Sequence, residues 1–319
     1  MEVFFTTVVR SAPQNKGGQL VRLDWTTKKV LGTVSMVPRD PTVIDRNPRG
    51  NARGGRGIVR LNELLIAGTY HSLLVFDQEL NSKGRITNNL LVGVHELCIR
   101  DGVLWVASTA IDGAIGVDQQ GRILSSWWPR EVPKLQKHLA LEPMKIDKDA
   151  DNRLKWLHEK VANAPNHTHL NALAFLGGQL HALLNRFGIV FNTASESILL
   201  EDSSITGCHN LLFLGEKMLI NDSRGKQLMV YTHRGKPIRV IDLMRYPEIA
   251  KINNDVSNKD PKKRALWLRG LSIVEENVVL IGFSPATIAE INIETGKLLD
   301  LFQYSKDVAV CVHGLLAWK

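Results

Sequence analysis

Residues 310–319 read VCVHGLLAWK, and residues 2–10 read EVFFTTVVR. The C-terminal stretch has the pattern of the innermost strand of a β-propeller blade, with no further strand after it. The N-terminal stretch, with GGQLVRLDW at 17–25 and VLGTVSMV at 30–37, has the pattern of the second, third and fourth strands, with no first strand before them. Pairing the two ends completes one antiparallel sheet and removes its exposed edges. The ends of the chain therefore predict a closed ring of sheets.

The same strand opening recurs six times and defines six blades. Val94-His95-Glu96-Leu97 and Cys208-His209-Asn210-Leu211 are two of its copies. Each copy is followed by apolar runs and Gly-containing or charged turns, which is the sequence form of antiparallel hairpins. We call the second residue of each opening a blade head; in blade order, the heads are His313, Arg56, His95, Asn171, His209 and Arg269. We predict an all-β, six-bladed β-propeller that forms a single domain over residues 1–319.

The spacing of the heads predicts three insertions. Arg56 and His95 are 39 residues apart, and Asn171 and His209 are 38 apart, which is the natural blade length here. Longer steps imply helical or loop insertions at about 38–55, 129–168 and 244–267. All three precede a first strand, so we expect them on the face that carries the heads, where they would form a lid over the channel.

Composition excludes several classes of protein. The chain has 319 residues, of which 44% are hydrophobic, so a large core is expected. No stretch approaches the roughly 18 apolar residues of a membrane span, and the N-terminus lacks a secretion signal, so we expect a cytoplasmic protein without membrane association. The net charge of +8 favours anionic partners. Nucleic acid is disfavoured, because the basic stretches RGNARGGRG and PKKR lack interleaved aromatic residues.

Three of the heads are histidines on alternate blades. His95, His209 and His313 would meet around a pseudo-threefold axis and could bind a divalent zinc, iron, copper or nickel ion. A second interpretation is a pocket for a small anionic molecule without metal, in which Arg56 and Arg269 hold the anionic group and Asn171 orients it. A third is that the histidines only fill a polar channel. The sequence leaves all three open.

Further polar residues are expected around the heads. Tyr70, His71, Arg186 and Arg224 lie at or near the ends of second strands and are predicted to contact substrate. His169 and Asp222 are the candidate catalytic residues. His169 could be a proton donor or a fourth metal ligand, and Asp222 could serve as a base, orient a histidine or be an ordinary turn residue. With a bound metal, they would support a lyase, isomerase or hydrolase step. The alternative function is a non-catalytic propeller that holds a protein partner on the same rim.

The runs HELCIRDGVLWVAS, HTHLNALAFLGGQLHALLN, CHNLLFLGEKMLINDS and LRGLSIVEENVVLIGFS resemble a family of bacterial β-propeller proteins of unknown function. The resemblance covers residues 53–318 and implies the fold rather than an activity. By architecture, the chain is distantly similar to six-bladed lactonases and strictosidine-synthase-like enzymes. It departs from the carboxylate and amide metal site of the lactonases, because imidazoles stand at its heads.

Overall fold

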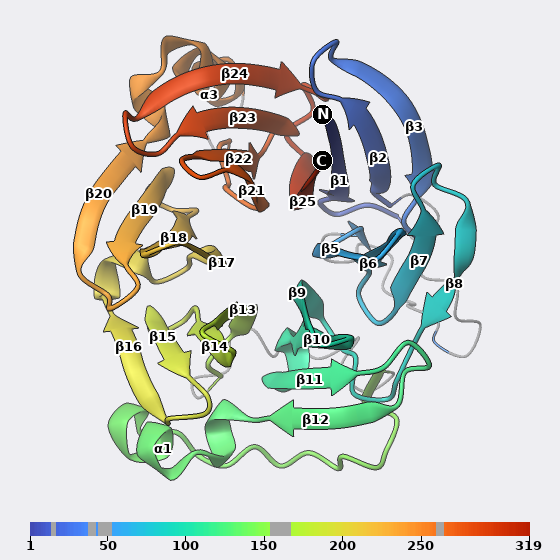
Figure 1. Cartoon of the computed structure of the whole chain (residues 1–319), viewed down its shortest axis with the longest axis vertical. Helices are drawn as coiled ribbons and strands as arrows, with labels where there is room; N and C mark the ends of the chain where they lie inside the picture. Colours follow the sequence, from blue (N-terminus) through green and yellow to red (C-terminus); the bar gives the residue numbers. More distant parts are fainter. Residues whose placement is uncertain (14–16, 38–42, 44–52, 154–166, 260–264) are drawn as a thin grey trace.

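The computed structural model describes residues 1–13, 17–37, 43, 53–153, 167–259 and 265–319. Its strands form six antiparallel sheets arranged in a ring around a central axis, as Figure 1 shows. The expected six-bladed β-propeller is confirmed.

Each blade runs from an innermost strand outward. Blade one contains β25 (Val310–Trp318), β1 (Glu2–Val9), β2 (Gln19–Asp24) and β3 (Lys29–Ser35), with the short β4 (Arg53–Gly54) paired to β1. Blade two contains β5 (Ile58–Leu61), β6 (Leu64–Gly68), β7 (Leu73–Asp77) and β8 (Ser82–Ile86). Blade three contains β9 (Val94–Arg100), β10 (Val103–Ser108), β11 (Gly113–Val117) and β12 (Ile123–Trp127). Blade four contains β13 (Leu170–Leu176), β14 (Gln179–Leu184), β15 (Ile189–Asn192) and β16 (Ser197–Glu201). Blade five contains β17 (His209–Leu214), β18 (Lys217–Asp222), β19 (Gln227–Thr232) and β20 (Pro237–Asp242). Blade six contains β21 (Leu271–Glu275), β22 (Val278–Phe283), β23 (Thr287–Asn292) and β24 (Lys297–Gln303).

The ring closes by pairing of the two ends of the chain, as expected. β1 and β25 are antiparallel, with Glu2 opposite Trp318 and Val9 opposite Val310. A bulge between Phe5 and Thr7 interrupts this ladder, and the Thr6 hydroxyl there donates to Arg56 O and accepts from Gly314 N at 2.8 Å. Thr6 therefore ties the closing blade to the head of blade two.

The core lies between the blades. Among the described residues, the buried apolar side chains form six clusters, one at each blade interface. The strands alternate residues between their two faces, so a blade flanked on both sides carries apolar residues on both faces. The outermost strands instead carry exposed residues, as in β8 and β12. This arrangement leaves the inner edges of the sheets to form the channel.

The described parts of the insertions pack at the blade interfaces. α1 (Pro133–Leu139) lies at the outer edge of the ring in Figure 1, and its Leu135 is fully buried between blades three and four. α3 (Pro247–Lys259) buries Ile249 between blades five and six. Most of 38–55 and the segment 154–166 lie outside the described residues, so a lid over the channel stays a prediction. No helix among the described residues is long and apolar enough to cross a membrane.

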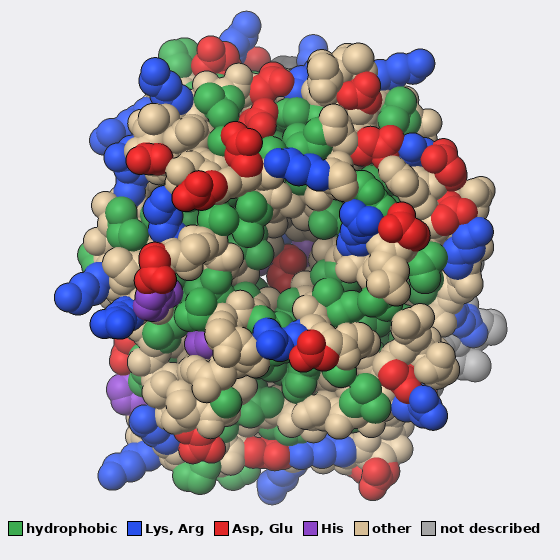
Figure 2. Space-filling view, viewed as in Figure 1, with side chains coloured by type: hydrophobic (Ala, Val, Ile, Leu, Met, Phe, Trp, Pro, Cys, Tyr) green, Lys and Arg blue, Asp and Glu red, His purple; other side chains and the backbone are tan. Residues whose placement is uncertain are grey.

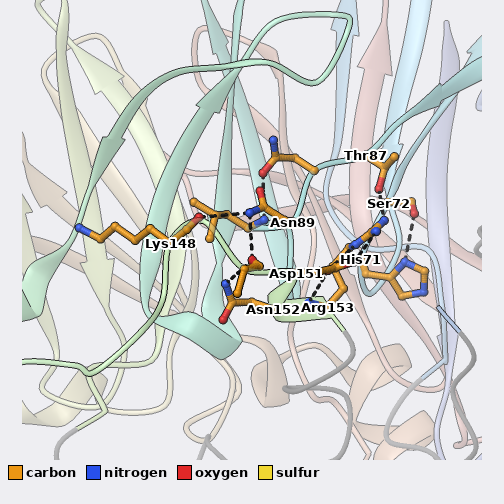
Figure 3. Close-up of polar contacts among 11 residues, drawn as sticks. His71, Ser72, Thr87, Asn89, Lys148, Asp151, Asn152 and Arg153 are labelled. Carbon is orange, nitrogen blue, oxygen red and sulfur yellow. Dashed lines mark hydrogen bonds and ion pairs between the residues drawn. The ribbon is translucent and has the colours of Figure 1, made fainter. Parts of the chain in front are cut away.

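One stretch of the second insertion is fixed to the blades, as Figure 3 shows. The Asn89 amide donates to the carbonyls of Lys148 and Ala150, at 3.1 and 2.9 Å, and Asn89 O accepts from Asn152 N at 3.1 Å. Arg153 Nη1 donates to Thr87 Oγ1 at 2.8 Å. These contacts anchor the insertion to the connection between blades two and three.

Candidate functional site

The structure brings the three histidine heads together. The ring centroid of His95 lies 5.3 Å from that of His313 and 5.9 Å from that of His209. These rings come from the innermost strands of blades three, one and five, so the alternation seen in the sequence becomes convergence in space. Figure 2 shows the molecule hollowed at the centre of the ring, with acidic and histidine side chains visible inside.

Glycines beside two heads allow the inner strands to pack closely. A Cβ on Gly57 would lie 2.8 Å from Glu96 Cα, and one on Gly314 would lie 2.2 Å from Arg56 O. Gly57 N also donates to His95 O at 2.7 Å. Backbone therefore meets backbone at these positions, and the neighbouring heads are held around a narrow channel.

The three imidazoles are held neutral. Burial lowers the pKa of His95, His209 and His313 well below the usual value, and the nearby charge of Arg269 lowers each further. His313 is fully buried, and His95 and His209 are nearly so. Near neutral pH, each ring therefore offers one N–H donor and one nitrogen acceptor.

Two arginine heads supply the positive charge of the site. Arg56 is 5% exposed and Arg269 is half-buried. Burial lowers the pKa of both guanidinium groups. For Arg269, burial and the charge of Arg56 lower the pKa to about 10. Within the described residues, the Arg269 guanidinium makes no hydrogen bond or ion pair, and its Nε is buried. A pKa of about 10 keeps Arg269 charged at neutral pH, and arginine side chains in general keep their charge in proteins.

Glu96 was not anticipated by the sequence analysis. One of its carboxyl oxygens lies 3.7 Å from His313 Nδ1. Burial raises the pKa of Glu96 to about 8, against the opposing effects of Arg269, Asn210 and Arg56. The group is therefore mostly protonated at neutral pH and supplies little negative charge to the site. The sequence did contain a signal for this residue, because Glu96 is an acidic residue within the strand opening Val94-His95-Glu96-Leu97.

His169 lies beside His95, one of the heads. Its ring centroid is 5.6 Å from that of His95 and 5.8 Å from that of His167. Its backbone adopts the left-handed conformation, with φ of 54°. Burial lowers the pKa of His169 to about 4. This ring is therefore also neutral near pH 7.

Asp112 holds the segment that carries His169, a role the sequence analysis gave to no residue. The Asp112 carboxylate is buried and accepts hydrogen bonds from Thr168 N at 2.8 Å and Leu170 N at 3.2 Å. It also accepts from the Thr168 hydroxyl at 2.6 Å. His169 lies between these two anchored residues, so Asp112 fixes its position.

Asp222, the predicted base, is engaged in a turn. Its Oδ1 accepts from Arg224 N at 3.0 Å and from Gly225 N at 2.9 Å. Among the described residues, none of its recorded hydrogen bonds or ion pairs involves a head histidine; Ser223 contacts His209 instead. A catalytic role for Asp222 stays a prediction.

The other predicted binding residues surround the heads unevenly. The Tyr70 ring centroid lies 5.4 Å from Arg56 Cζ, within cation–π range. His71 is buried, with Nδ1 3.1 Å from Ser72 Oγ. The charge of Arg186 acts on His169, whereas Arg224 packs beside Gly207. Tyr70 therefore contacts a head, and Arg186 lies near enough to His169 for its charge to lower the pKa of that ring.

Metal binding by the histidine triangle is the other prediction for this site. Among the described residues, no three His, Cys, Asp or Glu side chains are placed to hold a metal ion. Donor nitrogens are nevertheless present, since His95 Nδ1, His209 Nε2 and both nitrogens of His313 make no hydrogen bond in the described part of the chain. Binding of zinc, iron, copper or nickel stays a prediction.

Solved structures place the architecture among known folds. A protein of unknown function from Bacteroides caccae aligns with 98% of this chain and 98% of its own, at 10% identity and a TM-score of 0.58. A nidogen/laminin complex aligns over 98% and 97%, at 8% identity and 0.57. Virginiamycin B lyase from Staphylococcus aureus aligns over 98% and 91%, at 9% identity and 0.52. The chain has the propeller fold. No protein-family model and no curated protein matches the sequence, so these likenesses carry the fold alone.

Proposed function

We propose that the ring of heads binds a small anionic molecule in the central channel. The observation that carries this proposal is the Arg269 guanidinium, which has no hydrogen-bonding or ion-pairing partner among the described residues although its Nε is buried. Burying a charge without a partner is costly, so the Arg269 guanidinium favours binding of an anion. Carboxylate and phosphate match the planar fork of arginine best.

The surroundings of the arginines support an anion over a cation. The three head imidazoles and His169 have lowered pKa values, and the pKa of Glu96 is raised to about 8. The site therefore has two positive guanidinium groups and little negative charge near pH 7. Tyr70 and Asn171 add polar contacts around the charge.

The test is anion-dependent stabilisation against heat. Phosphate, succinate and malate are titrated into the protein at constant ionic strength, and the unfolding midpoint is measured. We expect a saturable rise that is lost in Arg269→Gln. It should remain in Arg239→Gln, which removes an exposed arginine from outer strand β20. Equal responses of all three proteins, or no response, would refute the proposal.

Metal-assisted catalysis is a second candidate, favoured by the head nitrogens that make no hydrogen bond in the described chain. A bound ion would polarise the substrate in a lyase, isomerase or hydrolase step, with His169 moving the proton. Metal content of untagged protein is measured beside a His95→Ala, His209→Ala, His313→Ala variant. Near-stoichiometric metal that disappears in the folded variant supports this candidate, and absence of uptake removes it.

A rim that holds a protein partner is the competing function. It predicts partner binding that is unchanged in Arg269→Gln and no saturable effect of small acids. The anion titration therefore separates the two functions.

A further inference from the structure

The tautomer of His209 follows from its neighbour Ser223. Ser223 Oγ donates its single proton to Leu268 O at 2.6 Å, and it lies 2.8 Å from His209 Nδ1. The hydroxyl therefore acts as acceptor toward the ring, and Nδ1 of the neutral imidazole carries the hydrogen. His209 Nε2 is thus an acceptor, and it is buried without a hydrogen bond among the described residues.

The amide orientation of Asn171 follows in the same way. Asn171 Nδ2 donates to Cys208 O at 3.0 Å, and Asn185 Nδ2 donates to the same carbonyl. Asn171 Oδ1 therefore points elsewhere, and it is buried without a hydrogen bond in the described chain. Asn171 itself is fully buried. Asn171 lies on β13 of blade four and His209 on β17 of blade five. The two acceptors, Asn171 Oδ1 and His209 Nε2, therefore belong to adjacent blades.

The charge lies at other blades of the ring. Arg56 heads blade two and Arg269 heads blade six, on either side of blade one, which carries His313. The ring is therefore cationic around blade one, while the heads of blades four and five present two acceptors without a hydrogen bond in the described chain, Asn171 Oδ1 and His209 Nε2. We call these two atoms the acceptor pair.

We propose that the ligand of this site is a small hydroxy acid, whose acid group binds Arg56 and Arg269 and whose hydroxyl donates its one hydrogen to an atom of the acceptor pair. This inference rests on the proposed anion site. A buried acceptor left without a hydrogen bond is destabilising, so a ligand that donates there gains affinity over one that cannot. An ammonium group would also donate, but the two guanidinium groups repel it. A hydroxyl donates without adding charge.

The experiment compares matched acids that differ only by the hydroxyl. Lactate is compared with propionate, and malate with succinate, by calorimetric titration into the whole protein. We expect each hydroxy acid to bind about tenfold or more tightly than its partner. In Asn171→Leu and His209→Phe, we expect the ratio of the two affinities within each pair of acids to shrink.

Controls separate loss of folding from loss of the acceptor. Asn192→Leu removes another buried amide from blade four, at the end of its third strand β15, and should retain the hydroxy-acid preference. The comparison in unmodified protein needs no variant and stands if a substitution prevents folding.

The outcomes distinguish this inference from the proposed function. Equal affinities within each pair, with binding still lost in Arg269→Gln, overturn the hydroxy-acid inference and leave the anion site intact. A preference that persists in both acceptor variants overturns it as well. If none of the four acids binds, the anion site fails and the inference fails with it.

Discussion

The Asp112 carboxylate accepts the Thr168 hydroxyl at 2.6 Å and the Thr168 backbone N–H at 2.8 Å, which joins blade three to the chain entering blade four. A third hydrogen bond comes from Leu170 N, so that the residues on both sides of His169 are bound to Asp112. We call these three hydrogen bonds the Asp112 clasp. The carboxylate therefore acts on the site by positioning, through backbone that it immobilises.

Replacement of Asp112 should loosen this clasp. An asparagine offers one acceptor oxygen to three donors, so Asp112→Asn leaves buried donors unsatisfied and should lower the free energy of unfolding by about 2–4 kcal/mol. Urea denaturation measures this loss. Asp118→Asn, in an exposed turn of the same blade, is the control and should cost less. Equal losses of unfolding free energy in the two variants would show that the hydrogen bonds of Asp112 contribute no more to stability than those of Asp118.

Removal of the Ser223 hydroxyl should release the tautomer of His209. In the unmodified protein, nitrogen-15 NMR of the histidine rings should show His209 protonated at Nδ1, because Ser223 Oγ can only accept there. Ser223→Ala should give a mixture of tautomers. A His209 ring protonated at Nε2 in the unmodified protein would contradict the hydrogen-bond pattern.

Glu96 should make the protein less stable as the pH rises. Its folded-state pKa is raised by burial from 4.5 to about 8, so the folded protein holds this proton more tightly than the unfolded chain. The stabilising contribution is complete below pH 4.5 and is lost as the pH rises through about 8. Unfolding free energies are measured from pH 4.5 to 9 for the unmodified protein and Glu96→Gln.

The difference between these two proteins isolates Glu96. The head histidines have lowered pKa values, so they act in the opposite direction and destabilise the fold as the pH falls below their unfolded value near 6.5. Both proteins retain these histidines, which largely removes their contribution from the difference. A difference that stays constant between pH 4.5 and 8 would show that Glu96 keeps an ordinary pKa.

Gly314 should tolerate no side chain. A Cβ there would lie 2.2 Å from Arg56 O, so Gly314→Ala forces apart the inner strands of blades one and two. We expect a loss of about 3 kcal/mol or more, measured by denaturation. Gly32→Ala, on outer strand β3, places its Cβ 3.4 Å from a Leu80 methyl group and is the control. Similar losses for both variants would refute the close packing.

The fold was readable from the sequence because it depends on patterns that repeat. The strand openings specify the blades, and the complementary ends specify their closure. Gly57 and Gly314, which directly follow two of the heads, allow the neighbouring inner strands to pack closely. The convergence of His95, His209 and His313 followed from blade symmetry alone.

The partners of the heads were harder to foresee, because each comes from a position without a repeated counterpart. Asp112 lies at the end of a short 3-10 turn and acts on residues more than fifty positions away, and Ser223 is one residue from the expected Asp222. Glu96 resembles an ordinary polar residue of a half-buried strand. Its protonation depends on burial by neighbouring blades, which sequence spacing does not report.

The pairing of β1 with β25 has a consequence for how ligand and folding are linked. His313 belongs to β25, so the ring of heads is complete only while β1 and β25 are paired. An anion that binds the complete ring stabilises the state in which β1 and β25 are paired, by mass action. Amide hydrogen exchange along Val310–Trp318 would then slow as the ligand concentration rises. Exchange at this one strand would therefore measure ligand binding in a channel whose other heads lie on five different blades.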